Sequence, residues 1–468
     1  MTDAMIELDV STPWEPPAPD RRGRRRWFAL AAVLVVAGSL HSAAAARHGL
    51  APLYQADPNV LTIDAAADRL YLVRQDAGGE AAQAIEAVAP RDGRVLWRRP
   101  MEHSESLFVA EGVVLVQDQG AGTGGGYTGR LVAIDGASGT VRWERPLSRR
   151  AGMIEPGGPA GVGGPGGRLV LVRDLAWPDE PQGFDTSYGP DDLSVALPLL
   201  PHHERYLALE LDTGRVVWSV ETSPGSVSSL DPTGFSDVTG LSVLDASGVL
   251  RVHDLRTGAV AATYRLDWSG AVALHRDGVP GQELVYRAGG RGVDVYDRAS
   301  GRLLWRWPGD PATGYHGLYP CLQGRYCVSG TDGTDVLNPA TGARLWRAER
   351  YNAARDGAPG TLMLDAEDGA DGRADDVAAF SGDTGALRWH LTGWHLAYSY
   401  ADRLTRHGAI VWRPVNDLAA VVGLLDPADG TVKVIGRAEN FYGTPQCAAT
   451  DDRIACVAVG RLFVWARP

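Results

Sequence analysis

The sequence predicts an all-β protein, an eight-bladed β-propeller of four-stranded antiparallel blades, with seven or nine blades also open. Three observations lead to this prediction. One short phrase recurs eight times, its copies usually lie about 43 residues apart, and each copy has alternating apolar and polar residues on both sides of a glycine turn. A repeat of that length that contains only strands is typical of a propeller blade.

Each copy of the phrase contains a polar turn that is closed by glycine. The segments LDTGRVVW, which ends at Trp218, and NPATGARLW, which ends at Trp346, show the pattern. Aspartate or asparagine near the start of the turn can bond to the backbone two residues on, and glycine supplies the positive φ that ends the hairpin. The eight turn glycines are Gly93, Gly139, Gly214, Gly258, Gly301, Gly342, Gly385 and Gly430.

Six of the eight copies carry a tryptophan shortly after the glycine. An indole is too large to stand on a solvated face in so many copies. We therefore expect each one to anchor its blade to a neighbouring blade and to bury roughly 150–250 Å² of apolar surface. The pattern implies no cofactor role. The six residues are Trp97, Trp143, Trp218, Trp305, Trp346 and Trp389.

The phrase D-x-x-T-G-x-x-x-W resembles the repeat of the pyrroloquinoline-quinone-like propeller family, and the resemblance spans roughly residues 60–466. That family includes quinone-dependent alcohol and sugar dehydrogenases as well as non-enzymatic propellers. For a quinone enzyme, the resemblance implies a disulfide between adjacent cysteines, acidic and amide ligands for calcium, and an aspartate base. This sequence has no Cys-Cys dipeptide and no matching acidic motif. We therefore expect no enzyme, no catalytic residue and no quinone cofactor.

The propeller is expected at residues 60–468. The stretch after the last phrase, CAATDDRIACVAVGRLFVWARP, has strands but no further turn and tryptophan. The simplest closure pairs strands from the two ends of the chain in one blade, which leaves no sheet edge open. The interval from Gly139 to Gly214 is 75 residues long, which predicts an insertion at about residues 155–204. Such a long insertion is usually either functional or disordered.

The N-terminal part of the sequence predicts a membrane anchor. Residues 27–46 contain no formal charge and follow the arginine-rich run 21–26. Such a stretch can cross a bilayer core of about 30 Å, and the arginines keep the N-terminus cytoplasmic. We expect a disordered cytoplasmic tail at 1–26, a transmembrane signal-anchor helix at 27–46, a linker at 47–59 and an extracytoplasmic propeller. The alternative is a signal peptide that is cleaved before Arg47 and releases a secreted protein.

Charge and cysteine content narrow the partners and the compartment. The net charge of −12 argues against a nucleic-acid partner, because phosphate binding needs a basic face. One lysine against 44 arginines suggests a GC-rich bacterial genome. The four cysteines form two close pairs, and an even number in an exported domain favours two local disulfides, Cys321–Cys327 and Cys447–Cys456. A redox-active or metal-bound set is the alternative.

One acidic loop resembles the calcium loop of integrin-type propellers, D-x-D-x-D-G-x-x-D. Residues 365–376 read DAEDGADGRADD, and in this register the candidate ligands are Glu367, Asp371 and Asp375. Gly369 replaces the middle ligand, and Glu367 replaces the first aspartate. Calcium takes about six to eight oxygen ligands, so these changes weaken the site. A weak calcium site and a solvated acidic turn both remain open, and no other cofactor is expected.

These features favour a non-enzymatic binding or scaffold protein of the cell envelope, with one membrane span and a protein partner. The alternatives are a quinone-dependent dehydrogenase-like enzyme and a propeller that binds a sugar or another small molecule. The repeat cannot choose between these classes, because the same fold supports many functions and the site decides among them.

Overall fold

The computed structural model describes residues 52–467 apart from several gaps, of which the longest are 155–168, 177–202, 310–317, 366–375 and 398–407. The described residues form strands but no helix, and so include no helix long and apolar enough to span a membrane. The predicted tail, anchor and first part of the linker, residues 1–51, lie outside them. Residues 52–468 make one compact unit.

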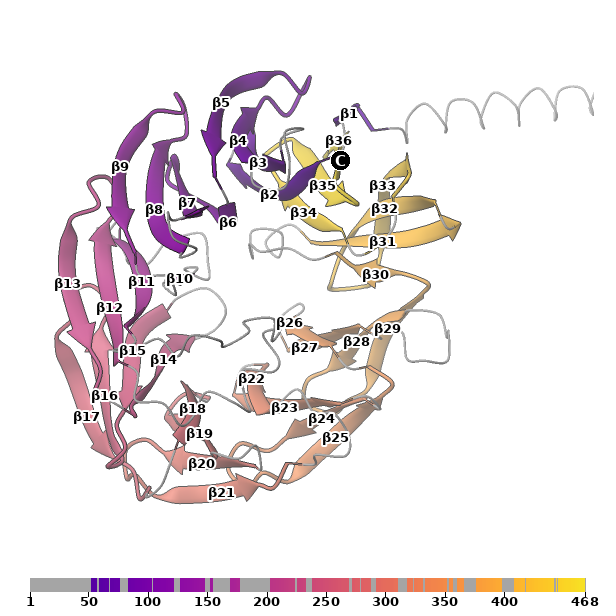
Figure 1. Ribbon diagram of the computed structural model, residues 1–468. Coiled ribbons are helices and arrows are strands. Elements are labelled where there is room, and N and C mark those ends of the chain that lie inside the picture. The colour runs from indigo at the N-terminus through magenta and orange to yellow at the C-terminus, as the bar shows by residue number, and fades with distance from the viewer. Residues whose placement is uncertain are drawn as a thin grey trace, which may run out of the picture. The chain divides into compact units, whose positions relative to one another are not determined.

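The strands of this unit form sheets that follow one another around a ring, as the colours of Figure 1 show. Blade 1 contains β2 (Val60–Ala66), β3 (Arg69–Gln75), β4 (Gln83–Val88) and β5 (Val95–Met101). Blade 2 contains β6 (Ser104–Ala110), β7 (Val113–Ala121), β8 (Tyr127–Asp135) and β9 (Val141–Pro146). Blade 3 contains β10 (Gly152–Ile154), β11 (Leu169–Ala176), β12 (His203–Glu210) and β13 (Val216–Glu221).

The next four blades repeat the same order, from an innermost to an outermost strand. Blade 4 contains β14 (Val227–Pro232), β15 (Val238–Leu244), β16 (Val249–Asp254) and β17 (Val260–Arg265). Blade 5 contains β18 (Val272–Asp277), β19 (Gln282–Arg287), β20 (Val293–Asp297) and β21 (Leu303–Trp307). Blade 6 contains β22 (Leu318–Cys321), β23 (Arg325–Gly330), β24 (Gly333–Leu337) and β25 (Arg344–Glu349). Blade 7 contains β26 (Ala353–Asp356), β27 (Thr361–Asp365), β28 (Asp376–Ser381) and β29 (Leu387–Thr392).

The last two blades bring the ends of the described chain together. Blade 8 contains β30 (His395–Leu396), β31 (Ala409–Asn416), β32 (Ala419–Leu425) and β33 (Val432–Glu439). Blade 9 contains β34 (Gln446–Ala449), β35 (Arg453–Ala458), β36 (Arg461–Ala466) and, as its outermost strand, β1 (Tyr54–Ala56). Each blade buries apolar residues on both faces, because both faces pack against neighbouring blades.

The glycine turn connects the third strand of a blade to the fourth. In blade 4, one carboxylate oxygen of Asp254 accepts hydrogen bonds from the backbone N–H groups of Arg256 and Thr257, at 3.1 and 2.8 Å. The N–H of Gly258 donates to the Asp254 carbonyl oxygen at 2.8 Å, and Gly258 has a φ of +70°. The aspartate and the glycine thus play the parts that the phrase predicts.

The phrase tryptophans connect six of the nine blades to the next one. The indole of Trp143 in blade 2 lies against Gly214 of blade 3, where an added Cβ would come within 2.6 Å of the ring. Its Nε1 donates to the Leu211 carbonyl oxygen at 2.8 Å. All six indoles donate in this way, over 2.7–3.1 Å, to a carbonyl three residues before the next turn glycine. The turn glycine is therefore required both for its backbone conformation and for the space it leaves.

The predicted number of eight blades is wrong, because the described residues form nine four-stranded sheets. Each phrase marks the third and fourth strands of one blade, and the eight phrases account for blades 1 to 8. In blade 9 the outermost strand comes from the other end of the chain, with Tyr54 paired to Val464. No turn joins β36 to β1, so this blade carries no phrase. The predicted pairing of strands from the two chain ends in one blade is confirmed.

Tyr54 takes the place in blade 9 that tryptophan has in other blades. Two of its ring carbons lie 2.8 Å from the position of a Cβ on Gly93, the turn glycine of blade 1. Its hydroxyl is buried and has no hydrogen-bond partner. The closing contact of the ring is thus made by a tyrosine, which the repeat pattern did not reveal because Tyr54 lies outside every copy of the phrase.

The strands of blade 4 contain no tryptophan, and at the glycine turn of blade 5 the backbone makes the contact instead. Ala262 pairs with Val252 at the register position that an indole holds in other blades. The carbonyl oxygen of Arg265 lies 1.7 Å from the position of a Cβ on Gly301, and the Asp267 N–H donates to the Gly301 carbonyl oxygen at 2.7 Å. A small side chain lets the two backbones approach directly.

The insertion expected at residues 155–204 contains strand β11, so the extra length is divided into two segments. Residues 155–168 precede β11 and residues 177–202 follow it, and both segments lie outside the described residues. Since β10, β11 and β12 are antiparallel, the chain leaves blade 3 for these segments at opposite ends of its strands.

The contact between glycine and indole predicts that alanine lowers stability more at one of two glycines of similar conformation than at the other. A Cβ on Gly385 (φ +68°) would lie 2.6 Å from the Trp346 ring. By contrast, no atom lies within 4 Å of the Cβ position of Gly281 (φ +83°). The positive φ should cost either alanine variant about 1–2 kcal/mol. Overlap with the indole should cost Gly385→Ala about 1–3 kcal/mol more. Denaturant unfolding measures both, and equal losses would contradict the contact.

The closing contact predicts different stabilities for two variants of Tyr54. Tyr54→Ala removes the ring from Gly93 and should lower the free energy of unfolding by about 2 kcal/mol, since the ring is only partly buried. Tyr54→Phe should cost nothing, because the buried hydroxyl has no partner to lose. Thermal unfolding of the two variants measures this. A phenylalanine variant as unstable as the alanine variant would show that the ring contact is not what closes the propeller.

Candidate functional site

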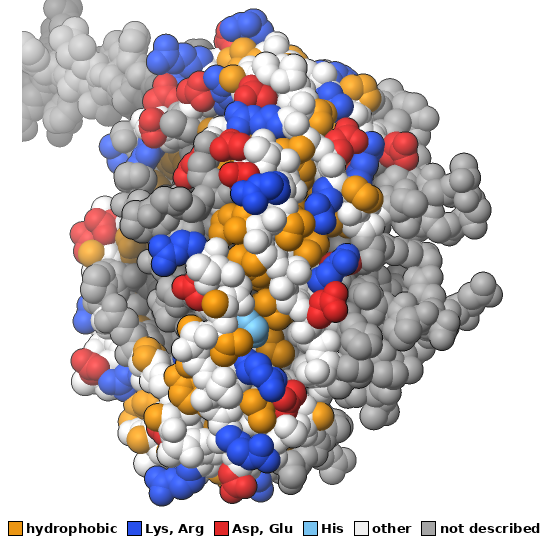
Figure 2. All heavy atoms as spheres, turned by 90° about the vertical axis from the view of Figure 1, so that its left-hand side faces the viewer, with side chains coloured by type: hydrophobic (Ala, Val, Ile, Leu, Met, Phe, Trp, Pro, Cys, Tyr) orange, Lys and Arg blue, Asp and Glu red, His pale blue; other side chains and the backbone are white. Residues whose placement is uncertain are grey.

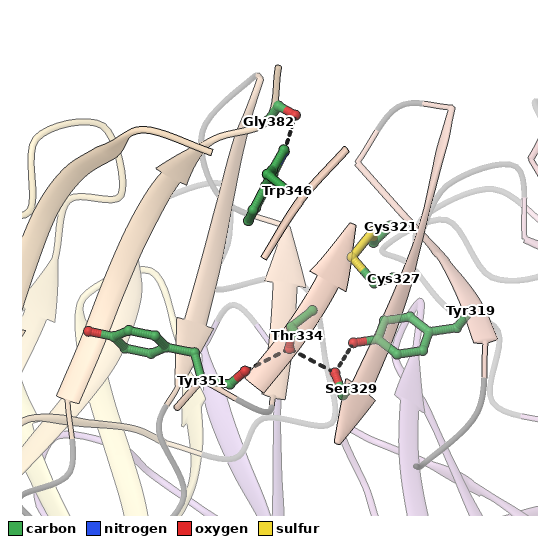
Figure 3. Close-up of a disulfide and its surroundings, with 8 residues drawn as sticks. All are labelled: Tyr319, Cys321, Cys327, Ser329, Thr334, Trp346, Tyr351 and Gly382. Atoms are coloured by element: carbon green, nitrogen blue, oxygen red, sulfur yellow. Dashed lines mark hydrogen bonds between the residues drawn. A yellow bond between two sulfur atoms is a disulfide. The ribbon is translucent and has the colours of Figure 1, made fainter. Parts of the chain in front are cut away.

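Both predicted disulfides are confirmed. Cys321–Cys327 joins β22 to β23 in blade 6, and Cys447–Cys456 joins β34 to β35 in blade 9. Each therefore ties an innermost strand to the strand beside it, as Figure 3 shows for blade 6. The described residues contain no free cysteine, so all four are paired and none is left as a thiol ligand for a metal.

A chain of hydroxyl groups lies beside the blade 6 disulfide (Figure 3). The Tyr319 hydroxyl lies 2.6 Å from the Ser329 hydroxyl, which lies 3.1 Å from that of Thr334. Thr334 donates to the Tyr351 carbonyl oxygen at 2.7 Å. The hydroxyl chain ends on a backbone carbonyl, and it connects β22, β23 and β24 to the segment that follows β25. This arrangement is suited to holding blade 6 together rather than to binding a ligand.

The candidate calcium ligands Glu367, Asp371 and Asp375 lie outside the described residues. Within the part of the chain that the structure describes, no three His, Cys, Asp or Glu side chains are grouped so that they could hold a metal ion. The calcium loop therefore stays a prediction from the sequence.

Buried carboxylates paired with partly exposed arginines recur from blade to blade. A carboxylate stays charged inside a protein only when charged or hydrogen-bonding partners surround it. Each pair also holds its guanidinium in one place, while the outer N–H groups stay accessible. Examples in four blades are Glu86–Arg98, Asp118–Arg130, Asp294–Arg306 and Asp376–Arg350.

Blade 3 holds two such pairs on neighbouring strands, Arg205–Asp174 and Arg173–Glu204, which we call the blade 3 arginine pairs. The two carboxylate side chains are at most 4% exposed, whereas the arginine side chains are 46% and 45% exposed. Neighbouring residues on a strand point to opposite faces of the sheet. Arg173 and Asp174 are neighbours on β11, and Arg205 lies opposite Asp174 on β12. The guanidinium groups of Arg173 and Arg205 therefore lie on opposite faces of blade 3.

Glu204 is the centre of a hydrogen-bond network between blades 3 and 4. It accepts from the Tyr206 hydroxyl at 2.9 Å, and also from Arg173 and from the hydroxyl of Ser228 on β14, the innermost strand of blade 4. Burial raises the pKa of Tyr206, and the charge of Glu204 raises it further, so the phenol stays protonated and donates. A carboxylate that already accepts three bonds is a poor candidate for proton transfer.

The blade 3 arginine pairs are therefore best suited to binding. Asp174 accepts from Arg205 through one oxygen, and its other oxygen is buried without a hydrogen-bond partner. A guanidinium fixed by a buried carboxylate can present its remaining N–H groups as a fork to a carboxylate on another molecule. The recognition would be of negative charge.

Sequence reasoning missed these residues. Glu204 lay at the end of the expected insertion, and Arg173 and Asp174 lay inside it. The sequence did contain a signal for these residues. Arg173 and Asp174 directly follow the apolar run LVLV, and Glu204 and Arg205 directly precede the apolar run YLAL. Charges at the ends of two strands that pair would be brought together by their register.

The network around Glu204 predicts that the charge of Glu204 contributes more to stability than the charge of Glu210, which lies on the same strand. Glu204→Gln leaves Arg173 without its anion and should lower the free energy of unfolding by about 2 kcal/mol. Glu210, on the same strand, bonds to the exposed Thr213 hydroxyl, and Glu210→Gln should leave stability unchanged. Denaturant unfolding compares the two, and equal effects would show that the network contributes little.

The sequence was compared with known proteins. The model of a family described as outer membrane protein assembly factor BamB matches residues 81–290 and 289–433. A tetrathionate hydrolase from Acidithiobacillus ferrooxidans is 30% identical over 168 residues, which are 29% of this chain and 31% of that protein. The chain thus matches about a third of the length of that curated relative.

Solved structures of other propellers are similar at low identity. BamB from Moraxella catarrhalis has a TM-score of 0.38 and 15% identity, over 88% of this chain and 99% of that one. A quinohemoprotein alcohol dehydrogenase from Comamonas testosteroni has a TM-score of 0.40 and 10% identity, over 89% and 76%. No role follows from likenesses this low. Because the family model covers most of the sequence, the chain belongs to the pyrroloquinoline-quinone-like propeller family whose description names the assembly factor BamB.

Proposed function

We propose that this chain is a non-enzymatic, membrane-anchored scaffold of the bacterial cell envelope, which binds an acidic segment of a partner protein. The blade 3 arginine pairs carry the proposal. Arginine is enriched at protein interfaces and among the residues that contribute most to binding. Because buried carboxylates hold Arg173 and Arg205 before a partner arrives, little side-chain entropy is lost on binding.

The location of the propeller outside the cytosol has independent support. The uncharged stretch 27–46 behind an arginine run favours a single span with the N-terminus in the cytoplasm. Two disulfides in the propeller fit an oxidising compartment. The family description, which names an outer membrane assembly factor, supports a role in the envelope.

An enzyme remains the second class that the sequence left open, and no contact among the described residues favours it. The two disulfides join cysteines that are six and nine positions apart, unlike the adjacent pair that a quinone enzyme of this family implies. The cysteines of this chain therefore do not fit the site that a quinone cofactor has in such enzymes.

Removing one of the blade 3 arginine pairs as a whole tests the proposed binding. The double variant Asp174→Asn/Arg205→Gln takes away both charges, so no unpaired charge is left buried. Arg215→Gln is the control, because Arg215 is exposed and pairs with the exposed carboxylate of Glu210. Chemical cross-linking in membranes, followed by purification of the full chain, measures partner capture.

The double variant should lose the cross-linked species that the unaltered chain and the Arg215→Gln control both form. Thermal unfolding and membrane fractionation show whether the double variant is folded and in place. A folded, membrane-bound double variant that keeps the same cross-linked species would contradict binding through the Arg205–Asp174 pair.

A further inference from the structure

The residue that follows the phrase tryptophan is basic in four blades, and blade 7 differs from the other three. In blade 7 this residue is His390, and the residue opposite to it on the third strand is Ala378. The carboxylate that His390 contacts comes instead from Asp376, at the start of the same third strand, β28. In blades 1, 5 and 6 an arginine contacts a carboxylate directly opposite, in the pairs Arg98–Glu86, Arg306–Asp294 and Arg347–Asp335.

His390 and Arg350 share one oxygen of Asp376. Nε2 of His390 lies 3.0 Å from Oδ2, and Nη2 of Arg350 lies 3.1 Å from the same atom. Two nitrogens this close to one oxygen are at most about 6 Å apart, so one small ligand can contact both side chains. The Asp376 side chain is 6% exposed, whereas those of Arg350 and His390 are 59% and 32% exposed. The two basic groups therefore face solvent above a buried carboxylate.

Arg350 is fixed by more than its contact with Asp376. It follows β25 and has a φ of +66°, a conformation that favours glycine. Its guanidinium carbon lies 5.6 Å from the centre of the Tyr351 ring, as in a cation–π contact. Tyr351 is buried, and its carbonyl oxygen accepts a hydrogen bond from the Thr334 hydroxyl (Figure 3). An arginine held in so unfavourable a backbone conformation indicates a use for its side chain.

The basic groups of this site have no exposed carboxylate bound to them. Figure 2, which shows the side of the ring that lies on the left in Figure 1, has basic and acidic side chains next to one another over much of that face. Within the described residues, by contrast, Arg350 forms its one ion pair with the buried Asp376, and the neighbouring Glu349 forms none. An anion that approaches Arg350 therefore displaces no surface carboxylate.

The contact with Asp376 determines what His390 can offer to a ligand. A neutral imidazole has one N–H donor and one nitrogen that accepts. Because Nε2 donates to Asp376, Nδ1 is the accepting nitrogen, and it forms no hydrogen bond with any residue that the structure describes. The guanidinium of Arg350 offers only donors. The two side chains together match a group that carries an anionic oxygen beside an acidic O–H.

We propose that Arg350 and His390 bind the hydrogen phosphate ion. The guanidinium donates to phosphate oxygens, and the P–O–H group donates to Nδ1 of His390. Sulfate has the same shape and charge but no hydrogen to donate, so one of its oxygens would face the lone pair of Nδ1. A phosphate monoester loses its last acidic hydrogen near about pH 6 and has the same disadvantage at higher pH. This site is separate from the blade 3 arginine pairs and gives the chain a ligand besides its protein partner.

Calorimetric titration of the full chain in detergent at pH 8 tests the proposal, because an ordinary imidazole is neutral at about that pH. Inorganic phosphate should bind at least roughly tenfold more tightly than sulfate or glycerol 1-phosphate, since the latter two leave Nδ1 without a donor. Equal affinities for phosphate and sulfate would overturn the proposal, and so would the lack of saturable phosphate binding. A glycerol 1-phosphate affinity equal to that of inorganic phosphate would also overturn it.

Two variants separate the contributions of the two side chains. Arg350→Gln removes the guanidinium and should weaken phosphate binding at least roughly tenfold. His390→Gln should still bind phosphate but should no longer prefer it to sulfate, because an amide can turn either its oxygen or its N–H group to the ligand. Arg437→Gln is the control, since the exposed Arg437 pairs with the exposed Glu439, and it should leave both affinities unchanged.

Thermal unfolding shows whether each variant is folded. A folded Arg350→Gln chain that binds phosphate as tightly as the unaltered chain would contradict the site, and so would a folded His390→Gln chain that still prefers phosphate to sulfate. If Arg350→Gln does not fold, the comparison of phosphate with sulfate on the unaltered chain decides, because it needs no variant.

Discussion

The ring depends on one contact, an indole of one blade laid over the turn glycine of the next. The contact constrains both partners. The glycine must lack a side chain, and the indole must reach the carbonyl group three residues before that glycine. Trp143 and Gly214 show this pairing, with a 2.8 Å hydrogen bond to Leu211. Because the contact repeats between blades, a short phrase in the sequence is enough to specify how whole sheets pack.

Three of the nine junctions lack the indole contact, and at two of them another group takes its place. At the closing junction the outermost strand comes from the N-terminal side, and Tyr54 supplies the ring that lies over Gly93. At the junction of blades 4 and 5, Ala262 stands at the indole position and the backbone at Arg265 packs on Gly301 instead. Both of these junctions keep the turn glycine, whereas the junction of blades 8 and 9 does without it, because no turn joins the last two strands of blade 9.

The sequence predicted the all-β propeller, the four-stranded blades and both disulfides, because each leaves a local pattern. The period and the glycine turns are read within one blade, and each cysteine pair lies within one hairpin, as Cys447 and Cys456 do. The blade count failed because the ninth sheet is assembled from distant segments and needs no turn before Tyr54. The blade 3 arginine pairs were missed for a related reason. Arg173 and Glu204 are 31 residues apart, and only strand register brings them together.

A crystal structure of the propeller tests the central contact most directly. Nine sheets are expected within residues 52–467. The phrase indoles should lie over the turn glycines of the next blade, and the Tyr54 ring should lie over Gly93. A ring of eight sheets, or a Tyr54 ring that lies away from Gly93 while the propeller stays closed, would contradict it.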